Sequence, residues 1–325
     1  MSYNRFSSKS RRFEYHGGID LVDCGDIHLF MMMRDNLYNI CVPPDRKGRA
    51  PADFYRNVQQ NGYTKPPIDR AGIKTDRRAR FALYKVVDHM VRHCSGFTFF
   101  DVGAFVGDVS LRFANYCRSE EAYCSFKCFD PTLAGDLVPF NIELNGLEKY
   151  ITHHSLAVSH IDGPISFEQR LGHSDSGSSA LSGGTKNTLV RSIRLSSILQ
   201  DIAPPAAFIK IDTENLEDVI IADCKKFILD APNALCVEVN ASSGRLFDTL
   251  AELTQTHALW DIGYVPRPFR ARTVRDMPSL LQNVQALPYG YTDVLAISRK
   301  MPNFEEIEAE LNLIEEEPVG YSLVY

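Results

Sequence analysis

The sequence predicts an α/β protein built on a doubly wound, mostly parallel sheet. From residue 97 onward, short apolar segments rich in β-branched and aromatic residues alternate with longer segments of helical periodicity. Several of the short segments end in an acidic residue and a turn. No internal repeat at a solenoid period is evident. Strands that alternate with helices in this way are typical of a parallel sheet with helices on both faces.

Length and composition allow one large α/β domain with an extension. The chain has 325 residues, of which 44% are hydrophobic and 23% charged, an ordinary globular balance. Its basic first residues lack an apolar segment, so we expect no secretory signal, and the apolar run 27–33 is too short to span a bilayer. The eight cysteines form no CxxC pair. We therefore expect reduced thiols, a cytoplasmic location and no membrane partner.

Charge is distributed unevenly along the chain. Residues 1–100 hold 17 Lys and Arg against 10 Asp and Glu, a balance of +7, and the remainder holds 18 against 31, a balance of −13. A basic front could attract an anionic substrate, but a dipolar surface is the simpler interpretation. The net charge of −6 predicts that nucleic acid is not a partner.

Three regions are predicted. Residues 1–75 form an irregular extension, polar and disordered at first, whose aromatic residues pack on the main domain or cover a site as a lid. Residues 76–300 form the main domain. Residues 301–325 form an acidic tail with seven Glu, which we expect to be a solvated face.

The main domain is predicted to begin with a helix from Asp76 to Cys94 that has apolar residues on one side. His89 and His93 have the spacing of a helical metal site, but no third ligand is indicated and both lie near the charged side. We therefore expect both histidines to face solvent, and we expect no metal.

The stretch 97–115, FTFFDVGAFVGDVSLRFAN, organises the rest of the domain. It predicts a buried strand, a tight turn and a second helix. Gly103 and Gly107 in the turn would let the backbone approach a ligand where a Cβ would clash.

The alternation continues to residue 298. Further strands are predicted at 123–130, 150–159, 165–167, 189–195, 206–212, 234–239, 263–266 and 293–298. Helices are predicted at 133–145, 216–227 and 246–256, and Pro139 either kinks the first or marks its start. The Gly/Ser-rich stretch 172–188 should be mobile.

Acidic residues end several of these strands: Asp101, Asp130 and Asp212, with Glu238 near the end of a fourth. The carboxyl ends of parallel strands meet at one edge, so these carboxylates should converge there. NAD is the first ligand to consider, but the turn D-x-G-x-x-x-G lacks the G-x-G-x-x-G fingerprint. S-adenosylmethionine fits better, because it offers a sulfonium, an ammonium and a ribose diol to carboxylates.

Over roughly residues 97–298 the chain resembles the FkbM-type class I methyltransferases. The resemblance rests on DVGAFVGDVS (101–110), FDP (129–131), NIELNG (141–146), LAVS (156–159), GPISF (163–167), GSSAL (177–181), KIDTENLE (210–217) and VEVN (237–240). In order, they look like the family's glycine motif, ribose-binding strand and helix, middle hairpin, serine-containing loop, K-I-D-V-E-G-x-E signature and the strand after it. The resemblance implies a seven-stranded, Rossmann-like methyltransferase sheet with an added hairpin.

Three residues depart from the family's pattern. Phe105 stands where the family usually has Asn, which removes a polar contact near the methionine end. Asp130 replaces the commoner Glu and shortens the reach to the ribose. Asn215 replaces the signature Gly, but Asn tolerates a left-handed turn better than most residues, so the loop should keep its shape.

The resemblance implies S-adenosyl-L-methionine as cofactor and methyl transfer to a hydroxyl of a sugar or other hydroxylated small molecule. The implied cofactor-binding residues are Asp101, Gly103, Ala104, Phe105, Gly107, Ser110, Asp130, Pro131, Ala157 and Asp212. Candidates for the general base are Asp212, Glu214 and Glu238, followed by His153 or His154. Only one of the two histidines can face the site, because adjacent strand residues point to opposite faces.

Two other functions stay open. Phe105 and Asn215 are compatible with a methyltransferase-like binding module that lacks activity. An NAD-dependent reductase is disfavoured by the glycine spacing. The sequence leaves open the methyl acceptor, the position methylated, any assisting metal and the oligomeric state.

Overall fold

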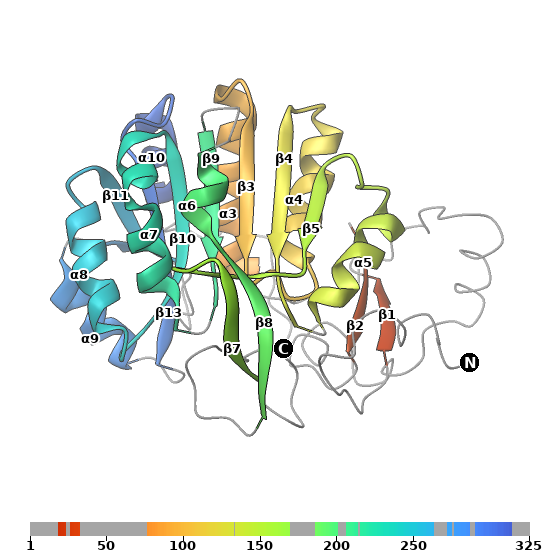
Figure 1. Cartoon of the computed structure of the whole chain (residues 1–325). Helices are drawn as coiled ribbons and strands as arrows, with labels where there is room; N and C mark the ends of the chain where they lie inside the picture. Colours follow the sequence, from red (N-terminus) through yellow and green to blue (C-terminus); the bar gives the residue numbers. More distant parts are fainter. Residues whose placement is uncertain are drawn as a thin grey trace.

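The computed structural model describes residues 19–23, 27–32, 77–132, 134–169, 186–200, 206–213, 215–262, 272–274, 276–286 and 290–313. Several predicted features lie outside these residues: most of the extension 1–75, residues 172–185 of the Gly/Ser-rich stretch, Glu214, the strand at 263–266 and the end of the acidic tail. The described elements form a central sheet between two layers of helices, with a smaller sheet beside it (Figure 1).

The central sheet has the strand order β12-β11-β13-β10-β9-β3-β4-β5. Its strands are β3 (Phe97–Val102), β4 (Cys124–Phe129), β5 (Ile151–His154), β9 (Ala206–Ile211), β10 (Asn233–Asn240), β11 (His257–Asp261), β12 (Arg272–Thr273) and β13 (Tyr291–Ser298). The neighbours from β5 to β10 pair in parallel, whereas β13 is antiparallel to both β10 and β11.

The chain enters this sheet in its middle, at β3, moves outward to β5, and then returns to β9 and proceeds the other way. Such a reversal defines a doubly wound sheet, and the point at which the strand order reverses lies between β3 and β9. Because β12 contributes only two residues at the margin, seven strands form the body of the sheet. The predicted doubly wound, mostly parallel, Rossmann-like fold is confirmed.

Side-chain alternation builds a core on each face. Along β3, Phe97 and Phe99 point to one face and Phe100 and Val102 to the other, and all four are buried. The first face packs against α3 (Arg77–His93), α4 (Asp108–Ser119), α5 (Val138–Asn145) and α10 (Phe304–Leu313). The second packs against α6 (Leu195–Leu199), α7 (Glu217–Asp230), α8 (Gly244–Leu253) and α9 (Met277–Ala286). With both faces covered, the central strands are mostly apolar.

The smaller sheet has the order β6-β8-β7, with β6 (Ala157–Ser159), β7 (Gly163–Gln169) and β8 (Lys186–Arg194). Antiparallel β7 and β8 form the added hairpin, which extends past the edge at which β3 and β4 end (Figure 1). The single strand predicted at 150–159 is instead two strands in different sheets. Leu156 N–H donates to His154 O at 2.8 Å, and this turn redirects the chain between them.

Part of the extension docks on the main domain. An antiparallel pair of strands, β1 (Ile19–Asp23) and β2 (His28–Met32), lies next to α5. The Asn145 side chain accepts a hydrogen bond from His28 N–H at 2.9 Å and donates one to His28 O at 2.7 Å. Leu29 is buried in the core shared with α3 and α4. The aromatic residues predicted to form a lid lie outside the described residues.

Other elements differ from their predicted form. The segment 301–325 does not start as a solvated tail, because α10 buries Phe304, Ile307 and Leu311 at helical spacing. The strand at His257–Asp261 was not predicted. Pro139 lies in the first turn of α5, after a 3₁₀ turn at Gly135–Leu137, so it starts this helix and does not kink it. No helix within the described ranges is long and apolar enough to cross a membrane.

Candidate functional site

The strand register arranges the predicted acids in two rows. Cys128, Asp101, Lys210 and Cys236 are paired side by side across β4, β3, β9 and β10. Side chains two residues further along each strand point to the same face and form an outer row at the carboxyl edge. Its members are Asp130, Gly103, Asp212 and Glu238. The four acids predicted to converge therefore lie at one edge and on one face of the sheet.

A buried ion pair forms the centre of the inner row. Asp101 is 1% exposed, and its Oδ2 accepts a hydrogen bond from Ser110 Oγ at 2.7 Å. Lys210 Nζ lies 3.6 Å from Asp101 Oδ1 and 3.1 Å from Asp212 Oδ2. Although burial lowers the pKa of Lys210, the two carboxylates outweigh it and raise this pKa above its ordinary value. The ammonium therefore stays charged and joins the two rows.

These contacts offset only part of the free-energy cost of burying the ionised Asp101 carboxylate. Burial raises the pKa of Asp101 above its ordinary value and outweighs the opposing influence of Lys210 and Ser110. Asp101 Oδ1 is buried, and within the described part of the chain it accepts no hydrogen bond. A buried acceptor without a donor is uncommon and calls for an explanation.

Asp212 differs from Asp101 in its access to solvent, since 43% of its side chain is exposed. The turn that follows it is held by Glu217, whose Oε1 accepts hydrogen bonds from Thr213 N–H at 2.9 Å and Thr213 Oγ1 at 3.1 Å. Burial raises the pKa of Glu217. Asn215 adopts φ 82°, the left-handed conformation expected for it. Asp212 is thus an accessible carboxylate on a well-supported turn.

The two turn glycines allow close packing within the protein. At Gly103, with φ +79°, an added Cβ would lie 1.8 Å from the carbonyl oxygen of Asp212. At Gly107, with φ +80°, it would lie 3.2 Å from Val138. Gly103 therefore lets the turn after β3 pack on the turn after β9, and the approach of a ligand to this turn stays a prediction.

Phe105 occupies the strained position of the same turn. Its φ of 53° is in the left-handed region, which costs a bulky residue about 1–2 kcal/mol. Phe105 N–H donates a hydrogen bond to Asp130 Oδ2 at 2.8 Å. This bond holds the turn in the strained conformation and orients the carboxylate.

Asp130 is 5% exposed and is bound closely by its own turn. Its Oδ1 accepts hydrogen bonds from Thr132 N–H, at 2.8 Å, and from the Thr132 hydroxyl. Gly135 lies against it, since a Cβ there would be 2.8 Å from Asp130 Oδ1. A ligand that reaches this carboxylate has to share its oxygens with the turn.

The other predicted cofactor residues are placed at the same edge but with buried side chains. These are Ala104, Ser110, Pro131 and Ala157, the last of which pairs with Ser192 in the smaller sheet. Sequence reasoning missed Lys210 and Glu217. Both lie within the motif KIDTENLE, but their roles depend on contacts across strands and turns that spacing does not reveal.

The other described candidates for the base lie on the outer strands of this edge. Glu238 is in β10, and His153 and His154 are in β5. Glu238 is half-buried, and its residue pairs with Asp293 across β10 and β13. Burial lowers the pKa of His153 to about 4, so its ring is neutral at pH 7. His154 stacks on Phe129, with ring centroids 4.8 Å apart, and burial lowers its pKa too. Glu214 lies outside the described residues.

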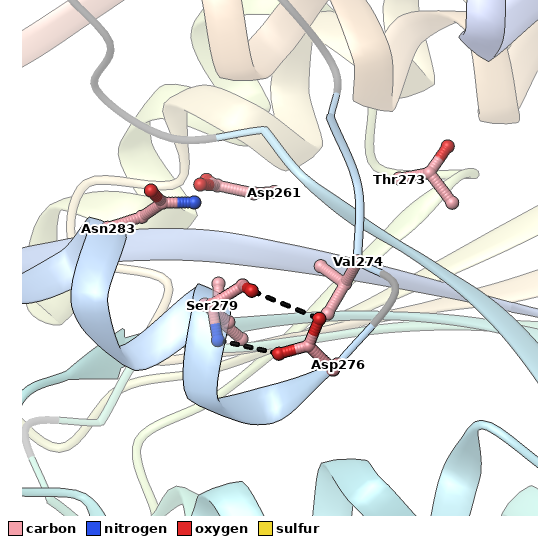
Figure 2. Close-up of a pocket in the computed structure, with 7 residues that line it drawn as sticks. Asp261, Thr273, Val274, Asp276, Ser279 and Asn283 are labelled. Carbon is pink, nitrogen blue, oxygen red and sulfur yellow. Dashed lines mark hydrogen bonds between the residues drawn. The ribbon is translucent and has the colours of Figure 1, made fainter.

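A cavity of about 140 Å³ lies at the far end of the same edge, between β11, β12 and α9 (Figure 2). Its lining includes Asp261, the last residue of β11, whose carboxylate faces the Asn283 side chain (Figure 2). Thr292 Oγ1 donates a hydrogen bond to Asp261. Ser279 donates to Asp276 through N–H at 2.8 Å and Oγ at 3.0 Å. These polar groups were not predicted, because β11 itself was missed.

No protein-family model and no curated protein matches the chain. Among solved structures, the methyltransferase FkbM from Methylobacillus flagellatus aligns at 15% identity over 62% of this chain and 44% of that one, with a TM-score of 0.39. Precorrin-6y C5,15-methyltransferase from Geobacter metallireducens aligns at 9% identity over 66% and 88%, with a TM-score of 0.35. A type I restriction-modification methyltransferase subunit from Streptococcus thermophilus aligns at 10% identity over 78% and 53%, with a TM-score of 0.38. Likenesses this distant say nothing of this chain's ligand or reaction.

Proposed function

We propose that the chain is an S-adenosylmethionine-dependent O-methyltransferase that acts on a hydroxyl of a sugar or another hydroxylated small molecule. The observation that supports this most is Asp101, a buried carboxylate with a raised pKa and an unused acceptor oxygen beside the turn after β3. Ionisable groups whose pKa is shifted by burial and by a charged neighbour cluster at functional sites. The resemblance of the surrounding motifs to FkbM-type methyltransferases points to the ligand.

The residues present fit S-adenosylmethionine in part. Asp101 and Asp212 offer carboxylate oxygens to an ammonium group, with Lys210 keeping the local charge balanced. Asp130 is the acid in the ribose-binding position, oriented by Phe105 N–H. Its shared oxygens make its contribution smaller than that of an unencumbered carboxylate. Gly103, Ala104 and Gly107 shape the turn after β3, and Ser110 holds Asp101 in place. We assign the buried Pro131 and Ala157 to the base of the proposed cofactor site.

The bound cofactor would supply an activated methyl group on a sulfonium. The chain's part is to align the acceptor hydroxyl, exclude water and receive the hydroxyl proton. Asp212 is our first choice for the base because 43% of its side chain is exposed. Such a base contributes about 10²–10⁴-fold. Glu238, Glu214, His153 and His154 are the alternatives.

The acceptor class follows from the polar character of the edge. Beyond Glu238, the cavity at Asp261 presents carboxylate, amide and hydroxyl groups from Asn283 and Ser279. Such groups bind hydroxyls in several directions, which suits a sugar or a similar polyhydroxylated molecule. The cysteines among the described residues are free thiols, in keeping with our expectation that the protein works in the cytoplasm.

A second candidate function is a binding module without catalysis. Phe105, in a strained conformation where the resembling family has Asn, and the engaged oxygens of Asp130 favour it. The two functions make the same prediction for cofactor binding and opposite predictions for methyl transfer.

The test uses the full chain, labelled S-adenosylmethionine and a panel of sugars and other hydroxylated small molecules. We expect label in at least one acceptor, with kcat reduced about 10²–10⁴-fold in Asp212→Asn. Asp248→Asn, an exposed residue of α8, is the matched control and should leave kcat unchanged. Cofactor binding without any transfer would favour the binding module, and absence of cofactor binding would overturn both functions.

A further inference from the structure

Two helices meet at the opposite, amino edge of the sheet. The carboxyl end of α3 leads into β3, and α10 follows the end of β13, which runs toward that edge. The helices pack through Met90 and Val87 of α3 and Ile307 and Leu311 of α10, all buried in one core. One ligand atom each of His89, His93 and Glu306 lies within 4.8 Å of the others at this junction.

His89 does not face solvent as predicted from its charged neighbours. It is 0% exposed, because α10 and the turn before it cover α3. Its Nε2 lies 2.7 Å from the carbonyl oxygen of Pro302. A carbonyl only accepts, so Nε2 carries the proton and Nδ1 presents a lone pair. Nδ1 is buried and has no hydrogen-bond partner in the described chain.

His89 has the hydrogen-bond arrangement that is typical of metal-bound histidines. Metal-bound histidines commonly donate their other N–H to a backbone carbonyl, which fixes tautomer and orientation. Pro302 provides that contact here.

His93 and Glu306 provide the other two donors. His93 Nε2 lies 3.1 Å from Glu306 Oε2, while Arg92 donates to Glu306 Oε1. His93 Nδ1 lies 2.7 Å from Asn303 Nδ2. A flip of the Asn303 amide would present its oxygen to Nδ1 and leave a lone pair on Nε2. A metal would bind that lone pair once Arg92 Nη1, which lies 3.3 Å from Nε2, turns away. Both helices thus supply partners that orient the donor set.

We infer that His89 Nδ1, His93 Nε2 and Glu306 form a Zn²⁺ site that fastens α10 to α3. Two histidines and one carboxylate are an established zinc ligand set that leaves a fourth position for water. Tetrahedral zinc needs its donors about 3.3 Å apart, so the partly exposed side chains of His93 and Glu306 would have to move toward His89 from their present spacing of up to 4.8 Å. The charge of Arg92 is offset by Asp88 and Glu310, both bonded to it.

The site is tested on the full chain, freed of metal with a chelator. Calorimetric titration with Zn²⁺ measures affinity, and Co²⁺ reports the ligand geometry by its absorption. We expect His93→Gln and Glu306→Gln each to weaken Zn²⁺ binding by roughly 10-fold or more. In both variants, the absorption bands that Co²⁺ shows when bound by nitrogen and oxygen ligands should disappear. Zn²⁺ should also raise the melting temperature of the unaltered chain and not that of these variants.

His160→Gln and Glu305→Gln are the matched controls, since both residues are exposed and neither belongs to the cluster. They should bind Zn²⁺ like the unaltered chain. Both test variants change partly exposed side chains, and circular dichroism checks that they fold. Failure of the unaltered chain to bind Zn²⁺, or unchanged affinity in both test variants, would overturn the site.

Discussion

The two edges of the central sheet hold their charged residues in different ways. At the carboxyl edge, Asp101 and Lys210 are buried, and the adjacent turn keeps Phe105 in a left-handed conformation. At the amino edge, Arg92 and Glu306 are partly exposed and pair across two helices. Buried charge and backbone strain cost the fold free energy, whereas exposed ion pairs change it little. Costly clusters usually persist where function requires them, which is our reason for assigning the cofactor to the carboxyl edge.

Protonation sets Asp101 apart from two histidines, His153 at the carboxyl edge and His257 at the amino edge. Burial raises the pKa of Asp101, so the folded state holds this proton more tightly than the unfolded state, and stability falls as pH rises above the ordinary Asp range. At the amino edge, burial lowers the pKa of His257 to about 4. There the unfolded state binds the proton more tightly, and stability falls as pH drops through this window.

The largest expected effect concerns the turn at the carboxyl edge. Gly103→Ala would place a Cβ 1.8 Å from the Asp212 carbonyl oxygen at φ +79°, so we expect a loss of about 4 kcal/mol or failure to fold. Gly244→Ala is the matched control, because no described atom lies within 4 Å of its Cβ position. Urea unfolding measures both. A small loss for Gly103→Ala would show that the two turns do not pack as described.

The next effect concerns the buried histidine at the amino edge. His257 is 1% exposed, and a pKa of about 4 against 6.5 predicts a loss on the order of 3 kcal/mol between pH 6.5 and pH 4. His257→Gln should remove the share of this slope that belongs to His257 and leave the share of His153, whose pKa burial also lowers to about 4. The exposed His160→Gln should leave the slope unchanged. Unfolding curves measured across this pH range give the slope of the unfolding free energy against pH for each variant. Equal slopes in His257→Gln and His160→Gln would contradict the assignment of this loss to His257.

A smaller effect of opposite sign is expected at Phe105. Asn is favoured at φ 53°, so Phe105→Asn should raise the free energy of unfolding by about 1 kcal/mol. Phe105→Ala keeps the unfavourable conformation and serves as the control. If Asn is no more stabilising than Ala, the strain is not located in this residue's backbone.

The smallest effect is expected at the exposed amino-edge pairs. Arg92 bonds to Asp88, Glu306 and Glu310, yet exposed ion pairs contribute little. In metal-free protein, Arg92→Gln should therefore shift the melting temperature by only a few degrees. A large drop in the melting temperature would show that these exposed ion pairs stabilise the fold strongly, which would contradict the contrast between the two edges.

The sequence was sufficient for the fold class and the row of acids because both depend on local periodicity and on strand ends. Asp101, Asp130 and Asp212 follow apolar segments of strand length, and parallel strands bring their ends together. The left-handed Asn215 was predictable because the resembling family has Gly at this position and Asn tolerates the same conformation. The sequence indicated only part of the proposed metal site, the histidine pair, because Glu306 lies more than 200 residues from His93.

What could not be predicted depends on contacts between elements. The burial of His89 comes from α10, whose apolar spacing at Phe304, Ile307 and Leu311 is obscured by its many Glu residues. The reason for Gly103 is the carbonyl of Asp212, a neighbour only in the folded sheet. The break between β5 and β6 lies in a two-residue turn without glycine or proline.

The most direct test of the cofactor assignment is calorimetric titration of S-adenosylmethionine into the full chain and into Asp101→Asn. Loss of a hydrogen bond to a charged group should weaken binding about 10-fold or more. The same change removes a buried charge whose pKa is raised, so at pH 7 the melting temperature should be equal or higher. Absence of binding to the unaltered chain, or equal affinity in Asp101→Asn, would contradict the assignment.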